Sequence, residues 1–314
     1  MRKIAGWIGS VDGKPIYVLH GIAGIGKSTI TQTIAQRAAE LGHLGASFFF
    51  SRNEDRRSNG KLFFSTIALQ LSQYDSEFAS SIGAALERTP DAPTRGIRDQ
   101  LHELIINPLR DLCRLRGRSV LIVVDAMDEC DLQDAKEILS LLTREHVPQF
   151  SFKVFITTRP EQHIRYILSG NHEQFYLHEI ERSVVEADIR HYLRHQLSRE
   201  MVQKELPELK PPPWEPRLKD LDALVRVAGK LFIIASTAVR FILDTTELNP
   251  RSQMARLLDG FDEEQINQRP EQALDNVYLQ VLRSAVPPGS RNHIVNRFQT
   301  VVGTIVLLRD SLPA

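Results

Sequence analysis

The feature that most constrains this chain is a glycine-rich segment, Gly21-Ile22-Ala23-Gly24-Ile25-Gly26-Lys27-Ser28, which matches the Walker A pattern G-x-x-x-x-G-K-[S/T] without deviation. The apolar run 16–20 before it predicts a buried strand, and a helical pattern at 27–41 follows it. Glycines allow a backbone to wrap a phosphate with its N–H groups turned inward, and the start of the helix adds partial positive charge. A chance glycine-rich turn lacks this strand–loop–helix context, so the segment predicts a phosphate-binding loop.

The residues of this loop suit a nucleotide with a metal ion. Lys27 is expected to bridge the β- and γ-phosphates, and the Ser28 hydroxyl is expected to coordinate Mg²⁺. The predicted nucleotide-binding residues are Gly21, Gly24, Gly26, Lys27, Ser28 and Thr29.

Short apolar runs alternate with long helical patterns through the first ~180 residues, which is typical of a parallel α/β sheet. The predicted strands are 16–20, 46–51, 120–124, 152–158 and 175–177, and the predicted helices are 27–41, 61–74 and 98–114. Pro108 is expected to kink or split the last of these helices. The continuous apolar strands indicate a sheet covered on both faces. The predicted fold class is therefore α/β, with a P-loop NTPase parallel sheet flanked by helices and followed by a smaller helical domain.

Carboxylates follow the third predicted strand. The run 120–124 is followed by Asp125, where a P-loop NTPase needs a carboxylate to hold Mg²⁺, as in a Walker B motif. Asp128 and Glu129 come shortly after, and one of them is expected to orient or deprotonate the attacking water. The alternative is a solvated acidic loop, since further acidic residues lie just beyond. Ser28 and Asp125 are the candidate metal ligands.

Arg159 follows the fourth predicted strand directly. An arginine at the end of a neighbouring strand can sense or neutralise the γ-phosphate. It can equally be a surface arginine that pairs with an acidic neighbour. The candidate catalytic residues are therefore Asp128, Glu129 and Arg159, with both readings of the arginine open.

After residue 180 the predicted strands end. Ser183 with Glu186 three residues later predicts a capped helix running to about residue 196, and further helical patterns cover 218–227, 231–243 and 271–282. We expect a P-loop nucleotide-binding domain at residues 1–180 and a helical domain at 181–284.

Composition narrows the partner classes. The 314 residues carry 39 Lys and Arg and 39 Asp and Glu, so no net positive field attracts nucleic acid or an anionic membrane. The longest apolar segment, 231–243, is shorter than the about 20 residues that span a bilayer. Two cysteines, Cys113 and Cys130, cannot by themselves form a disulfide framework or a four-ligand zinc site. We expect a cytoplasmic protein with no membrane span and no nucleic-acid partner.

Together these motifs carry a resemblance. The matching segments are Leu19–Ile30, Gly45–Arg52, Thr66–Leu71, Asp125–Cys130, Thr157–Glu161, Gly229–Ile233 and Leu274–Leu282. The sequence resembles the NACHT branch of STAND P-loop ATPases, especially the fungal, nephrocystin-like and NLR-like type. The resemblance implies a signalling switch that holds ADP when closed, exchanges it for ATP, forms homo-oligomers and meets protein partners in innate-immunity-like, cell-death or incompatibility pathways. It also implies slow Mg²⁺-dependent hydrolysis, with Asp128 as the preferred catalytic acid and Arg159 as the first sensor. The resemblance further implies that residues 285–314 are the start of a truncated winged-helix-like segment.

The sequence departs from this family at one matched segment. Many relatives have a Gly-Leu-Pro segment whose proline touches the nucleotide base, whereas here Lys230 follows Gly229, and Phe232 follows Leu231. The sequence therefore leaves ATP and GTP both open. Two other functions remain as alternatives: a nucleotide-binding or degenerate scaffold without hydrolysis, and a P-loop small-molecule kinase.

Overall fold

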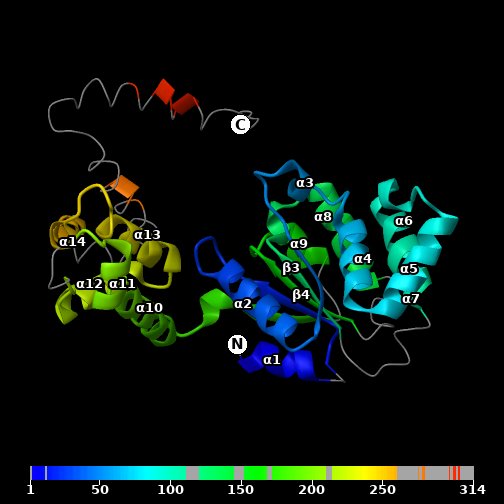
Figure 1. Ribbon diagram of the computed structural model, residues 1–314, viewed down its shortest axis with the longest axis horizontal. Coiled ribbons are helices and arrows are strands. Elements are labelled where there is room, and N and C mark those ends of the chain that lie inside the picture. Colours follow the sequence, from blue (N-terminus) through cyan, green and yellow to red (C-terminus); the bar gives the residue numbers. More distant parts are fainter. Residues whose placement is uncertain are drawn as a thin grey trace. The chain divides into compact units, whose positions relative to one another are not determined.

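The computed structural model describes residues 2–10, 13–110, 120–144, 152–167, 172–209 and 214–259, and single positions at 275, 278, 279, 297, 300, 301, 303 and 304. The chain divides into two compact units, Met1–Glu179 and Ile180–Ala314, called here the first and second unit (Figure 1). The predicted helix at 271–282 and the predicted winged-helix-like segment at 285–314 lie almost entirely outside the described residues.

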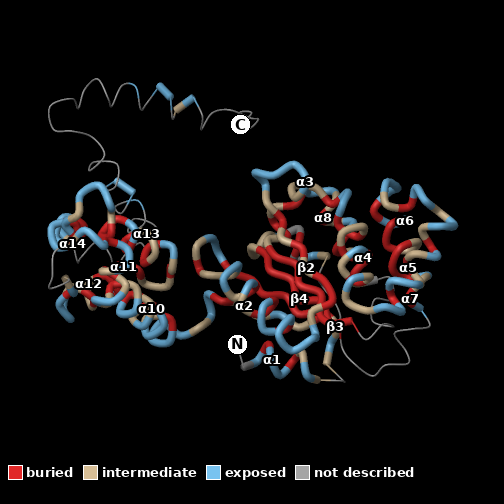
Figure 2. Tube along the Cα trace, viewed as in Figure 1, coloured by how far each residue is buried: buried red, intermediate tan, exposed pale blue. Residues whose placement is uncertain are grey.

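The first unit is built on a five-stranded sheet in the order β2-β3-β4-β1-β5, and every neighbouring pair is parallel. The strands are β1 Ile16–His20, β2 Leu44–Phe49, β3 Val120–Asp125, β4 Phe152–Thr158 and β5 His172–Tyr176. Every residue of β1, β3 and β4 is buried, which explains their continuous apolar runs (Figure 2). The predicted P-loop NTPase fold class is confirmed. Because β4 lies between β1 and β3, its carboxyl end is placed between the glycine-rich loop and Asp125.

Helices precede, connect and cover these strands. They are α1 Arg2–Gly9, α2 Lys27–Glu40, α3 Asp55–Ser58, α4 Phe63–Tyr74, α5 Ser76–Arg88, α6 Ile97–Leu101, α7 Asn107–Leu109, α8 Leu132–Arg144 and α9 Gln162–Ile167. A π-helical segment, His102–Ile106, joins α6 to α7. It lies directly before the turn that contains Pro108, whose nitrogen cannot donate to the preceding turn. The sequence patterns do not predict α1, α5 or α8.

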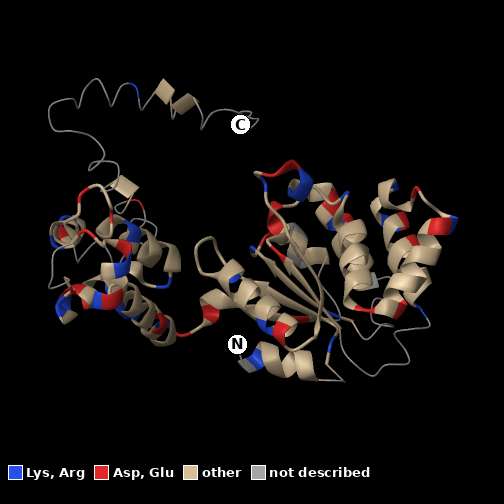
Figure 3. Ribbon diagram, viewed as in Figure 1, with Lys and Arg blue, Asp and Glu red and all other residues tan. Residues whose placement is uncertain are grey.

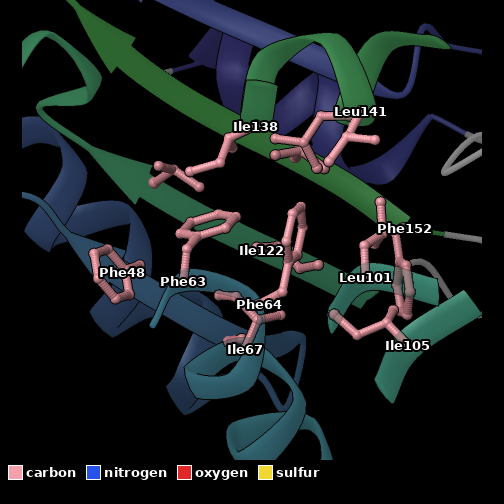
Figure 4. Close-up of a cluster of buried hydrophobic side chains, with 14 of the residues drawn as sticks. Phe48, Phe63, Phe64, Ile67, Leu101, Ile105, Ile122, Ile138, Leu141 and Phe152 are labelled. Atoms are coloured by element: carbon pink, nitrogen blue, oxygen red, sulfur yellow. The ribbon is translucent and has the colours of Figure 1, made fainter. Parts of the chain in front are cut away.

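The two faces of the sheet have different coverings, because side chains alternate along each strand. Even-numbered strand residues such as Ile122 join Phe63 and other residues of α4 in one apolar core (Figure 4). Odd-numbered residues lie on the opposite face. There Trp7 of α1 packs against Tyr17, with ring centroids 5.3 Å apart, and Tyr17 stacks on Phe155 at 5.9 Å. The sheet therefore has a hydrophobic layer on both sides.

Two strands differ from their predicted bounds. β2 ends at Phe49, and Phe50 lies beyond it although its side chain is buried. The ring of Phe50 stacks on Phe63 at 5.8 Å, so its side chain belongs to the core, while its N–H still donates to the Asp125 carbonyl of β3 at 3.1 Å. β5 begins at His172, three residues before the predicted start, because its first half is polar and pairs only with β1 at the sheet edge.

The second unit is helical throughout its described elements, which are α10 Arg182–Gln196, α11 Arg199–Glu205, α12 Leu218–Ala228, α13 Phe232–Ile242 and α14 Pro250–Asp259. Its core is a separate apolar cluster that includes Ile189, Leu193 and Leu224. The predicted capping box is wrong: the N-cap of α10 is Glu181, and Glu186 accepts a hydrogen bond from Arg182 Nε at 2.6 Å.

The placement of charged residues and the apolar character of the helices agree with the sequence composition. Lys and Arg positions and Asp and Glu positions are interspersed along the helices of both units, while the visible strands of the central sheet carry few of either (Figure 3). Among the described residues, no helix combines the length and the apolar character that crossing a bilayer requires.

Candidate functional site

The glycine-rich loop joins β1 to α2 in a conformation that its glycines make possible. Gly24 has φ 75° and Gly26 has φ 101°, both in the left-handed region that favours glycine. A Cβ atom at Gly21 would lie 2.8 Å from Ile25 Cγ2, closer than real side chains approach. The Gly21 N–H donates to the Thr158 carbonyl at 3.2 Å, which fixes the start of the loop to the end of β4.

Lys27 is folded over this loop. Its ammonium donates to the carbonyl oxygens of Gly21 at 2.8 Å and of Ile22 at 3.3 Å. Burial lowers the pKa of Lys27 from its ordinary value, and the charge of Asp128 opposes that shift most strongly. Arg159 lowers the same pKa further, whereas Asp125 and Glu129 raise it. The structure therefore brings all four predicted charged residues within electrostatic range of one ammonium group.

Ser28 and Thr29 lie in the first turn of α2, and both are exposed. The N-cap of this helix is Gly26, which has no side chain to accept from the first backbone N–H groups. Those N–H groups and the helix dipole favour an anion at this position. The predicted phosphate-binding residues thus surround the start of a helix of 14 residues.

Asp125 ends β3 and is only 3% exposed. Its Oδ1 atom accepts from Thr31 Oγ1 at 2.8 Å and from Thr157 Oγ1 at 2.5 Å. The N–H of Ala126 donates to Thr157 Oγ1 at 3.0 Å. Thr31 and Thr157 are two polar contacts of the site that the sequence analysis does not assign.

The acidic turn after β3 begins with a residue in the left-handed backbone region. Ala126 has φ 54°, a left-handed conformation that costs a residue with a Cβ atom about 1–3 kcal/mol. The 3-10 turn Met127–Glu129 follows, and Met127 is fully buried in the apolar core. The strained backbone therefore places the neighbouring Asp128 in the interior of the fold.

Asp128 and Arg159 form an ion pair. Arg159 Nε lies 2.9 Å from Asp128 Oδ2, and the Arg159 backbone N–H donates to Asp128 Oδ1 at 3.0 Å. The Asp128 side chain is 2% exposed, whereas that of Arg159 is 43% exposed. Arg159 therefore pairs with an acidic neighbour, as one interpretation of the sequence expects. That neighbour, Asp128, is itself a candidate catalytic residue, so Arg159 lies at the candidate site.

Arg52 holds the other side of the acidic turn. Its Nη2 atom donates to the Asp128 carbonyl at 2.7 Å, and its backbone N–H donates to Glu129 Oε2 at 3.2 Å. A cavity of about 750 Å³ lies beside this turn and is lined in part by Arg52, Lys61, Asp128 and Glu129. The sequence analysis uses Arg52 only as part of the resemblance, because no local pattern connects it to a turn 76 residues away.

The donors present fit Mg²⁺ in combination with phosphate. A hydroxyl at Ser28 and a carboxylate at Asp125 are hard oxygen ligands. Within the part of the chain that the structure describes, no group of three or more His, Cys, Asp or Glu residues is arranged to hold a metal.

Cys130 closes the acidic turn but offers no thiolate. Burial, followed by the charges of Asp134 and Asp131, raises the pKa of the Cys130 thiol to about 12. The thiol therefore stays protonated at neutral pH, and it acts as a small buried side chain.

Comparisons with known proteins add a family and several fold likenesses. The family model for nephrocystin 3, N-terminal, matches residues 2–159, half of the chain. A search of curated proteins finds no significant match. Among solved structures, Cdc6p from Pyrobaculum aerophilum is 13% identical with a TM-score of 0.46, over 95% of this chain and 82% of that one. The structure of Drosophila ORC bound to DNA is 12% identical with a TM-score of 0.43, over 99% and 68%. PCH-2 from C. elegans is 11% identical with a TM-score of 0.41, over 79% and 60%.

Proposed function

The chain belongs to the nephrocystin 3, N-terminal family, and on that premise we propose that it is a signalling switch operated by ATP and ADP, with slow Mg²⁺-dependent hydrolysis. The first unit has the P-loop nucleotide-binding fold. In the proposed cycle ADP accompanies a closed state, exchange for ATP opens it, and hydrolysis resets it. The pathway we propose is of the innate-immunity, cell-death or incompatibility type.

One observation carries the proposal. The glycine-rich loop, the end of β4 and the acidic turn after β3 are joined by direct contacts: the Gly21 N–H donates to the Thr158 carbonyl at 3.2 Å, and Arg159 Nε lies 2.9 Å from Asp128 Oδ2. The charges of Asp125, Asp128, Glu129 and Arg159 also shift the pKa of Lys27. In open α/β sheets ligands bind at the carboxyl ends of the strands, and this is the edge where these groups lie. A lysine, an arginine and a buried carboxylate around a glycine-rich loop are the groups that recognise a nucleotide polyphosphate with its metal ion.

The residues divide the binding work. Lys27 exchanges its bonds to the Gly21 and Ile22 carbonyls for phosphate oxygens, while the N–H groups of the loop hold the remaining oxygens. Ser28 and Asp125 hold Mg²⁺, which neutralises charge on the phosphates when bound. The partly exposed Arg159 side chain can reach the γ-phosphate if its guanidinium leaves the ion pair with Asp128.

The two contacts between Asp128 and Arg159 support the proposal that hydrolysis is slow. Both of its carboxylate oxygens accept hydrogen bonds from Arg159, one from the side chain and one from the backbone. Asp128 must loosen one of these bonds before it can orient or deprotonate water. A γ-phosphate that attracts the Arg159 guanidinium releases Asp128, so binding and hydrolysis are linked through one ion pair.

The proposal extends to the partners of the switch. We propose that the ATP-bound form makes homo-oligomers and meets protein partners in the cytoplasm, without nucleic acid or a membrane span. Equal numbers of acidic and basic residues, 39 each, support the exclusion of a polyanionic partner. Lys230 Nζ donates to the Ile180 carbonyl at 2.5 Å, so the residue at which the sequence departs from the Gly-Leu-Pro pattern has a structural contact in the second unit.

The test follows the γ-phosphate of labelled ATP incubated with the purified full chain and Mg²⁺. The switch predicts nucleotide binding and a slow, Mg²⁺-dependent release of labelled inorganic phosphate, together with a larger assembly by light scattering when ATP hydrolysis is blocked. Transfer of the label to an added small acceptor would establish a kinase instead. Nucleotide binding without any phosphate release would establish the non-hydrolysing scaffold.

A further inference from the structure

Two buried threonine hydroxyls converge on a single oxygen of Asp125. Thr31 comes from α2, and Thr157 comes from β4; both are 0% exposed. Their Oγ1 atoms lie 2.8 Å and 2.5 Å from Asp125 Oδ1. Polar groups are buried at a free-energy cost unless they are hydrogen-bonded, so this arrangement needs a reason beyond space filling.

The direction of the shorter hydrogen bond, between Thr157 and Asp125, follows from a second contact of Thr157. Thr157 Oγ1 accepts from the Ala126 N–H at 3.0 Å, which leaves the single Thr157 hydroxyl proton to donate to Asp125. Thr31 Oγ1 also lies 2.9 Å from the Lys27 carbonyl, so its one proton is shared between that carbonyl and Asp125. The two hydroxyls fix the rotation of the Asp125 carboxylate and occupy Oδ1.

The two threonines also connect two different elements of the site to Asp125. Thr31 lies one helical turn after Lys27 on the helix that the glycine-rich loop begins. Thr157 precedes Arg159 by two residues, at the end of β4. Asp125 is therefore held at once by the phosphate-binding helix and by the strand that carries the arginine.

We propose that Thr31 and Thr157 are positioning residues that orient Asp125 Oδ2 for the Mg²⁺ of a bound nucleotide. This inference rests on the proposed function. Groups that orient a metal ligand without touching the metal change metal affinity by about 10–100-fold when removed. The two threonines thus set how strongly Mg²⁺ tightens nucleotide binding, while the glycine-rich loop and Lys27 set the affinity for the nucleotide itself.

The experiment compares Thr157→Val and Thr31→Val, which remove one hydroxyl each at nearly constant volume, with Thr157→Ser and Thr31→Ser, which keep it. Thr33→Val is the matched control on α2, because the Thr33 hydroxyl donates only to the Thr29 carbonyl, at 2.8 Å. A non-hydrolysable ATP analogue is titrated into each full-length protein by calorimetry, once with Mg²⁺ and once with a chelator. The melting temperature of each protein without nucleotide is measured alongside.

The quantity of interest is the ratio of the two dissociation constants. We expect both valine variants to bind the metal-free analogue as the wild type does and to lose about tenfold of the Mg²⁺-dependent gain. The serine variants recover that gain, and Thr33→Val keeps it. Valine variants that melt earlier but keep the wild-type ratio would show a structural role only and overturn the proposal.

Two further outcomes are distinguished by the design. A wild type that binds the analogue equally with Mg²⁺ and with chelator contradicts the proposed function itself, and the positioning role falls with it. Should a valine variant fail to fold by circular dichroism, Thr157→Ala and Thr31→Ala, which add no branched carbon, replace it in the same titration. Their unchanged ratio would overturn the proposal in the same way.

Discussion

The two units differ most in what they bury. Among the described residues, the buried polar or charged side chains of the first unit include Asp125, Asp128, Lys153 and His172, whereas the second unit buries only Gln253. Burying a polar group costs free energy unless its bonds are made, and burying a charge costs more. The core of the second unit is almost wholly apolar, whereas the buried polar groups of the first unit include residues of the candidate site.

Within the first unit these buried polar groups lie at opposite ends of the sheet. At the carboxyl ends, Asp125 and Asp128 meet threonine hydroxyls and Arg159. At the amino ends, Lys153 Nζ donates to the Gly13 carbonyl at 2.9 Å, and Lys14 Nζ donates to the His172 carbonyl at 3.0 Å. The contacts at the carboxyl ends involve side chains that suit a nucleotide, whereas those at the amino ends tie the entry to β1 to the sheet.

The largest effect that tests this comparison is a cavity in each core. Leu71→Ala in the first unit and Leu193→Ala in the second each truncate a side chain that is 0% exposed. Each is expected to lower the free energy of unfolding by about 2–5 kcal/mol. Saturating ATP with Mg²⁺ is expected to raise the melting temperature of the unit that carries Leu71 and to leave that of the other unit unchanged. A single transition that ATP shifts equally in both variants would show that the two units unfold together.

Removal of the Lys27 ammonium should affect nucleotide binding without affecting the fold. Charge-assisted hydrogen bonds contribute about 1.5–3 kcal/mol each, so Lys27→Ala is expected to weaken ATP binding about 100-fold. The exposed Lys219 of the second unit gives the control Lys219→Ala, which is expected to bind as the wild type does. Equilibrium titration with a fluorescent ATP analogue measures both, and a Lys27→Ala affinity equal to that of the wild type would contradict the phosphate-binding role.

A smaller effect separates the two acidic residues of the turn. Asp128→Asn is expected to slow hydrolysis about 10–100-fold while changing ATP affinity little, since it removes a carboxylate from the reaction and not from the phosphate-binding loop. Glu129→Gln, one residue further, is the matched variant. Single-turnover phosphate release decides between them: a slow Glu129→Gln beside a normal Asp128→Asn would transfer the catalytic role to Glu129.

The smallest effect is a pH dependence of stability that arises in the first unit from His172. Burial, and then Lys14, lowers the pKa of His172 from its ordinary 6.5. The unfolded chain therefore binds this proton at a higher pH than the folded chain does, so the contribution to stability is complete above pH 6.5 and is lost as pH falls toward the folded pKa.

His172→Gln is expected to remove this slope, which amounts to at most about 1.4 kcal/mol per pH unit. His191 of the second unit is exposed, and His191→Gln is the matched control for the substitution itself. Urea unfolding between about pH 5 and 8, the range in which histidine titrates, measures both. Parallel curves for wild type and His172→Gln would contradict the burial effect.

Local signals predict the centre of the fold well. The strands β1, β3 and β4 match their predicted bounds closely, because a strand buried on both faces must be apolar throughout. The edge strand β5 is polar in its first half and gives no such signal. Helix α5 does carry a local signal, since the Asp75 side chain accepts from the N–H groups of Glu77 and Phe78, but a single capping residue is a weak pattern.

The residues of the site likewise fall into those that the sequence predicts and those that it does not. The glycine-rich loop and Asp125 follow from spacing, because their chemistry needs residues that are adjacent in sequence. Thr31 lies 94 residues and Thr157 lies 32 residues from Asp125, and no sequence period connects them. Arg159 is predicted as a candidate, yet its bond to Asp128 depends on the strand order β3-β4, which the sequence does not specify.

The most direct test of the central claim is to purify the full chain, denature it and identify any released nucleotide by chromatography, with Lys27→Ala treated identically. The account predicts stoichiometric ADP or ATP from the wild type and none from the variant, which would also settle the identity of the base. A folded wild type that releases no nucleotide and does not bind added ATP with Mg²⁺ would contradict it.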